Sequence, residues 1–136
     1  MNGSTGYNPS TNATLPGMTI PTMAEAVRQL FGRIAGRYDL VNRVLSARRD
    51  VHWRRAALDL LRGEPKDVLD LACGTFDFSL AALASGKAQR VHGCDFCAPM
   101  LLAGANKRAS HAVSASVGDA LRLPFADASF DAAIMA

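Results

Sequence analysis

The sequence predicts an α/β fold in which strands of a parallel sheet alternate with helices. The first observation is the stretch at residues 68–77, V-L-D-L-A-C-G-T-F-D, where an apolar run breaks at a glycine and a helix-compatible run follows. The second observation is that short apolar runs and helix-compatible runs continue to alternate as far as residue 136. Strands that alternate with helices are joined by right-handed crossovers and therefore lie parallel.

The first part of the chain predicts a tail and then helices. Residues 1–22 are rich in Asn, Ser, Thr, Gly and Pro, and we expect a disordered tail because they offer little to bury. Residues 23–66 predict a helical extension or lid. Its first helix begins after Thr22, which can cap it, and its apolar residues recur at helical spacing: Val27, Leu30, Phe31 and Ile34.

A second helix is expected from about residue 51 to residue 61. Gly63 and Pro65 follow it and end it. Its expected apolar stripe consists of Trp53, Ala56, Ala57, Leu60 and Leu61.

The remainder predicts strands at residues 68–72, 90–96, 112–117 and 130–135, with helices at 77–85 and 98–108. The first strand is apolar except for Asp70, which is typical of a strand covered on both faces. Pro99 lies near the start of the second of these helices, where proline is favoured. Because a crossover helix and further strands would normally follow the fourth strand, we expect residues 67–136 to form an incomplete domain.

The turn after the first strand predicts a ligand with a ribose. Asp95 ends the second strand about 20 residues past Gly74, where an acid can accept hydrogen bonds from ribose hydroxyls. The turn has one glycine instead of the G-x-G-x-x-G of dinucleotide folds, and we expect no basic residue nearby for a phosphate. This pattern favours a ribose ligand without a phosphate, such as S-adenosylmethionine.

Other residues near these strand ends have two interpretations each. Thr75 and Asp77 fit either helix capping or, by the resemblance described below, the lining of the methionine end of the ligand. Asp70 fits either a buried structural carboxylate bonded to the turn or an acid near the ammonium group of the ligand. Asp119, followed by Ala120, fits either a turn aspartate or an acceptor for the adenine amino group, with an adjacent backbone N–H serving a ring nitrogen. Phe96 fits either the adenine face or the core.

The cysteines and the charges restrict the other functional classes. Cys94-x-x-Cys97, with Cys73 and His92, resembles a metal or redox motif, but we expect small semi-buried residues beside a cleft and no metal. No secretory signal or apolar span is present, which favours reduced thiols and a cytoplasmic location.

Residues 23–66 are basic, with ten Lys and Arg against five Asp and Glu. This segment is either a solvated helical face or a surface for anionic lipid. Sparse aromatic residues argue against nucleic acid as a partner.

Five motifs together resemble the ubiquinone/menaquinone biosynthesis C-methyltransferases, a branch of the class I S-adenosylmethionine-dependent methyltransferases. They are F-G-R-I-A-G-R-Y-D-L-V-N-R-V-L-S at residues 31–46, W-R-R at 53–55, V-L-D-L-A-C-G-T at 68–75, G-C-D-F at 93–96, and G-D-A-L-R-L-P-F-A-D-A-S-F-D at 118–131. The glycine turn alone marks only the superfamily, whereas the first and last motifs are more specific.

The resemblance implies a Rossmann-like sheet with the strand order 3-2-1-4, of which residues 67–136 would be the N-terminal half. It implies methyl transfer from S-adenosylmethionine to a ring carbon of a polyprenyl quinol, and from this we expect peripheral contact with the inner face of the membrane. The cofactor contacts that it implies are Asp70, Gly74, Thr75, Asp95, Phe96, Asp119 and Ala120, and it leaves the catalytic base unassigned. The alternatives are an inactive fragment and a small-molecule O- or N-methyltransferase.

One residue departs from the family pattern. The family usually has glycine where this chain has Phe76, and glycine there permits close approach of a ligand. A ring at this position either enters the cleft and partly blocks the cofactor, or packs between sheet and helix with Phe78. We expect the partial block, because the helix start faces the pocket.

Overall fold

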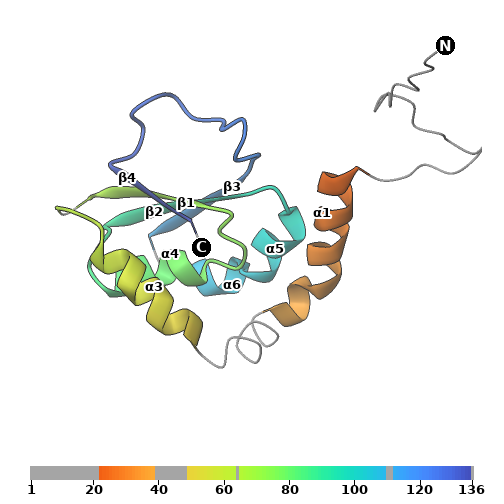
Figure 1. The fold of residues 1–136 in the computed structure, drawn as a ribbon, viewed down its shortest axis with the longest axis horizontal. Helices are drawn as coiled ribbons and strands as arrows, with labels where there is room; N and C mark the ends of the chain where they lie inside the picture. The colour runs from red at the N-terminus through yellow and green to blue at the C-terminus, as the bar shows by residue number, and fades with distance from the viewer. Residues whose placement is uncertain (1–21, 39–48, 64, 110–111, 136) are drawn as a thin grey trace, which may run out of the picture.

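The computed structural model describes residues 22–38, 49–63, 65–109 and 112–135, so the expected tail lies outside this range apart from Thr22. The described residues contain a four-stranded parallel sheet with the order β3-β2-β1-β4 (Figure 1). Its strands are β1 (Asp67–Leu71), β2 (Arg90–Asp95), β3 (Val113–Val117) and β4 (Ala132–Met135). The expected order and the parallel pairing are confirmed.

The N-terminal helix begins where the sequence predicts. Helix α1 (Met23–Ile34) is capped by Thr22, whose hydroxyl accepts from the Glu25 N–H at 3.3 Å, while the Glu25 carboxylate accepts from the Thr22 N–H at 2.8 Å. This reciprocal capping box satisfies two N–H groups that the helix cannot pair itself. The helix continues into the 3₁₀ turn η1 (Ala35–Arg37), which packs on Met100 and Cys97.

Helix α3 (Arg49–Asp59) shows that the expected apolar stripe is wrong except at Leu61, which packs against the core just after the helix ends. Trp53 and Leu60 are 61% and 81% exposed, whereas Leu58 is 2% exposed. The inward-facing line runs through Arg54, Leu58 and Leu61, which are spaced one helical turn apart. The hydrophobic pattern does not reveal this inward face, because one of its residues is a charged arginine. Arg54 can face inward because it pairs with the Asp77 carboxylate of α4.

Helix α4 (Asp77–Ala84) agrees with the prediction, but the expected helix at residues 98–108 is divided into α5 (Ala98–Ala103) and α6 (Ala105–Arg108). The break lies at Gly104. A Cβ atom there would lie 2.7 Å from the Phe76 ring and 2.8 Å from the Thr75 Cα atom. The glycine therefore lets the break between the two helices approach the turn that follows β1.

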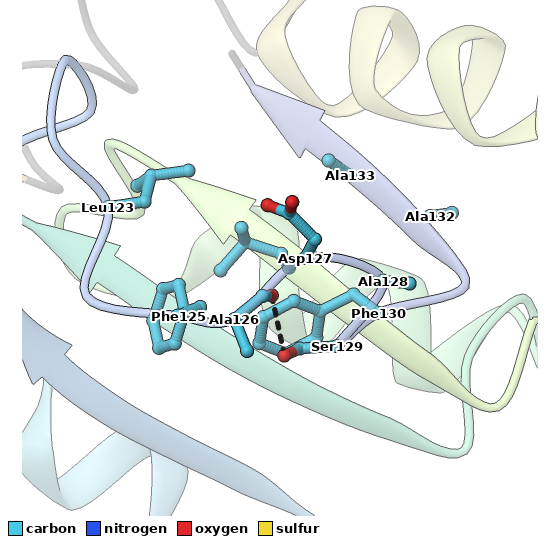
Figure 2. A pocket seen from close by; sticks show the side chains of 10 residues that line it. Leu123, Phe125, Ala126, Asp127, Ala128, Ser129, Phe130, Ala132 and Ala133 are labelled. Carbon is cyan, nitrogen blue, oxygen red and sulfur yellow. Dashed lines mark hydrogen bonds between the residues drawn. The ribbon is translucent and has the colours of Figure 1, made fainter.

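The two faces of the sheet are covered differently. Helices α3, α4 and α6 lie on one side, and the segment between β3 and β4 passes over the other (Figure 1). The main core on the helical side comprises Leu58, Val68, Phe78, Ala82, Ala88, Val91 and Ile134. On the other side, Phe125 and Phe130 line a cavity of about 380 Å³. Figure 2 shows their side chains. None of the described helices is long and apolar enough to cross a membrane.

Candidate functional site

The candidate site lies at the carboxyl edge of the sheet. Strands β1, β2 and β3 are parallel, so the residues that follow them meet at one edge. Gly74 follows β1, Asp95 ends β2 and Asp119 follows β3. The carboxyl edge of an open parallel sheet is where such folds bind ligands.

Asp95 joins the glycine turn to the start of α5. One carboxylate oxygen accepts from the Gly74 N–H at 2.8 Å, and the other accepts from the Cys97 N–H at 2.8 Å. Gly74 has a φ of +54°, a left-handed conformation that favours glycine. Each carboxylate oxygen can accept a second hydrogen bond, so Asp95 keeps acceptor capacity for ligand hydroxyls after holding the turn.

A cleft of about 530 Å³ opens next to this edge. Phe96, Gly118 and Asp119 line one side of it, and Val27 and Arg28 of α1 line the other. The Asp119 carboxylate accepts from the Leu121 N–H at 2.9 Å, which is the turn arrangement, and Ala120 beside it is exposed. Phe96 and Asp119 therefore share one cleft, while the described lining of this cleft includes neither Thr75 nor Asp95.

Thr75 is buried and contacts a lysine. The Lys107 ammonium group donates to the Thr75 hydroxyl at 3.2 Å and to the Asp77 carboxylate at 2.7 Å. Arg54 lies 3.6 Å from the same carboxylate. The expectation of no basic residue near the turn is therefore wrong, although Asp77 offsets both cations. The N-cap residue of α4 is Phe76, so neither Thr75 nor Asp77 occupies the capping position.

Asp70 lies inside the protein, beneath α4. It is almost fully buried, and the Ser79 hydroxyl donates to its carboxylate at 2.5 Å. Burial raises the pKa of Asp70 to about 6, and the hydrogen bonds with Ser79 and the charge of Arg54 oppose that rise. These contacts favour the structural interpretation, in which the carboxylate joins β1 to the helix that follows the turn.

Phe76 is packed away from the cleft, so the expected partial block is wrong. The side chain is 0% exposed and lies in a cluster with Cys73, Leu101 and Val113. The alternative interpretation is also only partly right, because Phe78 belongs to a different cluster. The backbone of Phe76 keeps a φ of +69°, the left-handed conformation that glycine would adopt without strain.

The three cysteines are buried, so the expectation that they are semi-buried is wrong, and they are unpaired with one another. Burial raises the pKa of the Cys73 thiol, which disfavours the reactive thiolate. His92 lies on the loop-covered face, where its ring nitrogens lie 2.7 and 2.8 Å from the Ser114 and Ser116 hydroxyls. Within the described ranges, no group of three or more His, Cys, Asp or Glu residues could hold a metal ion.

Sequence reasoning missed three cations and one glycine of this region. Arg28, Arg54 and Lys107 reach it from three different helices. None follows a strand end, and the W-R-R motif that contains Arg54 does not indicate what this side chain contacts. The interruption of the apolar pattern at Gly104 is a further signal in the sequence, but the sequence-based prediction includes that residue in a continuous helix at residues 98–108.

Comparison with known proteins identifies relatives along most of the chain. A model of the ubiE/COQ5 methyltransferase family matches residues 20–136. The demethylmenaquinone methyltransferase of Deinococcus radiodurans is 45% identical over 111 residues, which cover 79% of this chain and 46% of the relative. That of Thermus thermophilus is 44% identical, covering 79% of this chain and 50% of the relative. The chain thus spans about half the length of these curated relatives.

Solved structures support the same fold. A putative S-adenosyl-L-methionine-dependent methyltransferase from Methanococcus maripaludis aligns with a TM-score of 0.66 at 17% identity, covering 88% of this chain and 53% of that one. A chain from the complex of the Haloferax volcanii Trm112 methyltransferase activator with a putative methyltransferase aligns with a TM-score of 0.64 at 25% identity, covering 77% of this chain and 46% of that one. The Rossmann-like class I methyltransferase fold is therefore confirmed.

Proposed function

The chain belongs to the ubiE/COQ5 methyltransferase family, and we propose that it carries the cofactor-binding half of an S-adenosylmethionine-dependent C-methyltransferase. The acceptor that we propose is a ring carbon of a polyprenyl quinol. Demethylmenaquinol is favoured over a ubiquinone precursor, because the curated relatives are named demethylmenaquinone methyltransferases. The observation that carries the proposal is the shared carboxyl edge, where Asp95 holds the glycine turn beside the cleft of Phe96 and Asp119.

In the proposed complex, the ribose hydroxyls bind to Asp95 and the adenine lies in the cleft against Phe96. Asp119 accepts from the adenine amino group, and the Ala120 N–H serves a ring nitrogen. The methionine end of the cofactor lies near Gly74 and Thr75. Lys107 orients the Thr75 hydroxyl by donating to it. The Asp70 carboxylate acts behind this site by holding α4 through Ser79.

Methyl transfer requires the protein mainly to align the reacting groups. The sulfonium methyl group is already activated, so the site must bring the quinol carbon into line with it and exclude water. A quinol carbon becomes nucleophilic when its hydroxyl loses a proton, which requires a base or a bound water. Our proposal assigns that base to none of the described residues.

Binding and transfer measurements on the full-length protein test the proposal. Calorimetry should show S-adenosylmethionine binding that is tighter than NAD binding. Asp119→Ala should weaken it by about 1.5–3 kcal/mol, because a charge-assisted hydrogen bond is lost. Asp127→Ala, which removes an exposed acid lining the other cavity, is the matched control. Tighter binding of NAD would refute the cofactor assignment.

A transfer assay with methyl-labelled S-adenosylmethionine separates the possible acceptors. Label should enter demethylmenaquinol at carbon. Cofactor binding with transfer only to an oxygen or nitrogen acceptor would refute the quinol and leave the cofactor assignment intact.

We also propose peripheral contact with the inner face of the cytoplasmic membrane, where a polyprenyl quinol resides. Arg49 and Arg55 are exposed on α3 and suit anionic headgroups, whereas Arg54 is 15% exposed and engaged with Asp77. Arg48 lies outside the described residues. Replacing Arg49 and Arg55 with Gln should reduce sedimentation with phosphatidylserine vesicles, and Arg122→Gln is the control. Sedimentation independent of lipid charge would contradict this proposal.

A further inference from the structure

The cleft at the carboxyl edge has a second wall that comes from the helical extension. Met23, Ala24, Val27 and Arg28 of α1 face Phe96, Val117 and Asp119 across it. In this wall, Arg28 is the charged residue, and its guanidinium carbon lies 5.7 Å from the centroid of the Phe96 ring. The cation thus lies over the same aromatic face on which the proposed function places adenine.

The backbone of Arg28 is held while its side chain is exposed. The Cys97 thiol lies 3.7 Å from the Arg28 carbonyl oxygen, and Gly32, one turn later, approaches Pro99 of α5. These contacts fix α1 against the start of α5, immediately after the strand that carries Asp95. The guanidinium group extends from this fixed point over the cleft, so it can move without moving the helix.

The distance between Arg28 and Phe96 is too short for a base to lie between them. Two stacking contacts of about 3.5 Å each require about 7 Å between the outer planes. Arg28 must therefore move outward by roughly 1–2 Å when a planar ligand enters. A flexible exposed arginine makes that movement readily and then presents its planar cation to the outer face of the ligand.

We propose that Arg28 is a positioning and specificity residue of the cofactor cleft, where it stacks on the outer face of adenine opposite Phe96. This inference rests on the proposed function, because it assigns a further contact to the same ligand. It gives the helical extension a direct part in cofactor binding. It also makes adenine recognition depend on two segments, α1 and the end of β2, which are far apart in the sequence.

Calorimetry on the full-length protein with adenosine, S-adenosylhomocysteine and S-adenosylmethionine tests the inference. Arg28→Ala should weaken all three by a similar factor of about five, because each ligand presents the same adenine face. Arg33→Ala, an exposed arginine on the last turn of α1, should leave all three affinities unchanged. Arg28→Gln, which keeps a planar group without charge, should weaken binding less than Arg28→Ala.

The thermal midpoint without ligand distinguishes a ligand contact from a structural role. It should fall only slightly in Arg28→Ala, because the contact with Phe96 is exposed and contributes little to stability. Unaltered or tighter binding by Arg28→Ala, while the unchanged protein binds S-adenosylmethionine, would overturn this inference and leave the proposed function intact. A loss confined to S-adenosylmethionine would also overturn it. Failure of the unchanged protein to bind any of the three ligands would overturn the proposed function and this inference with it.

Discussion

The two faces of the sheet differ in what covers them and in how closely the cover fits. On the helical face, Val68 and Val91 are buried beneath α4, and the Phe76 ring fills the space above Gly93 and Gly104. On the opposite face, Phe125 and Phe130 are only partly buried, and the irregular segment that carries them lies beside a cavity of about 380 Å³.

This difference explains how the candidate site is supported. The glycine turn rests on the closely packed face, where Phe76, Ser79 and Lys107 contact it or the strand before it. A closely packed interior transmits small changes in volume, so substitutions there should be costly. Among the contacts of the described residues, none joins the loop-covered face to the glycine turn. Substitutions on that face should therefore reduce the free energy of unfolding by less.

The largest expected effect is that of Phe76→Gly. Removing a buried phenylalanine costs about 3–5 kcal/mol, whereas relief of the left-handed backbone returns about 1–2 kcal/mol. We therefore expect a net loss of about 1–4 kcal/mol in the free energy of unfolding, measured by urea denaturation. Affinity for S-adenosylmethionine should stay equal or fall, because the ring does not enter the cleft. Tighter binding by the glycine variant would contradict this packing.

A double-mutant cycle with Gly104→Ala isolates the contact. In the unchanged protein, the added methyl group would lie 2.7 Å from the Phe76 ring, so the substitution should destabilise. In the Phe76→Gly background that ring is gone, and the cost of Gly104→Ala should fall. Equal costs in both backgrounds would show that the two residues do not interact.

The next effect concerns Asp70 on the same face. Its pKa is raised by burial to about 6 in the folded protein, above its ordinary value. The folded protein therefore holds this proton more tightly than the unfolded chain, and the resulting stability is lost as the pH rises from about 4 through 6. Asp70→Asn should remove this loss and make the protein more stable at pH 7 by about 2–3 kcal/mol.

Thermal melts of both proteins at pH 4.5 and pH 7.5 measure this difference. Asp67 and Asp131 have lowered pKa values and respond to acid in the opposite direction, but they are common to both proteins and cancel in the comparison. A difference between the two proteins that does not change with pH would show that Asp70 does not titrate in this range.

The sheet could be predicted from the sequence because its signals are local. Each strand is a short apolar run bounded by turn residues, and each observed strand lies within two residues of the expected range. Thr22 capped its helix as expected, because a capping residue acts within one turn. The arrangement of Gly74 beside Asp95 followed from parallel strands whose carboxyl ends share an edge.

The predictions that were wrong concern residues whose positions depend on partners distant in the sequence. The direction of the Phe76 ring depends on space left by Gly93 and Gly104, and the inward face of α3 depends on Asp77 as a partner for Arg54. The cations near the turn come from helices whose placement no local pattern specifies. The direct cofactor contacts and the division of the chain at residues 22 and 66 remain predictions.

The smallest expected effect lies on the loop-covered face, at Phe125. Its ring meets His92 edge-on at 5.0 Å and Phe130 at 5.1 Å, and such pairs contribute about 0.5–1.5 kcal/mol each. Because Phe125 is partly exposed, Phe125→Ala should cost about 1–2 kcal/mol, less than Phe76→Ala on the helical face.

The same substitution should change the titration of His92, whose pKa is lowered because its surroundings exclude water. A base with a lowered folded pKa takes up its proton more readily in the unfolded chain, so stability falls as the pH drops through the ordinary histidine range. Phe125→Ala admits water to the ring, raises the pKa of His92 toward its ordinary value and makes this fall shallower. NMR titration of the imidazole measures the shift directly, with Phe31→Ala as a control at an aromatic site away from His92. An unchanged pKa of His92 would mean that the strand, with Ser114 and Ser116, excludes the water without help from the loop.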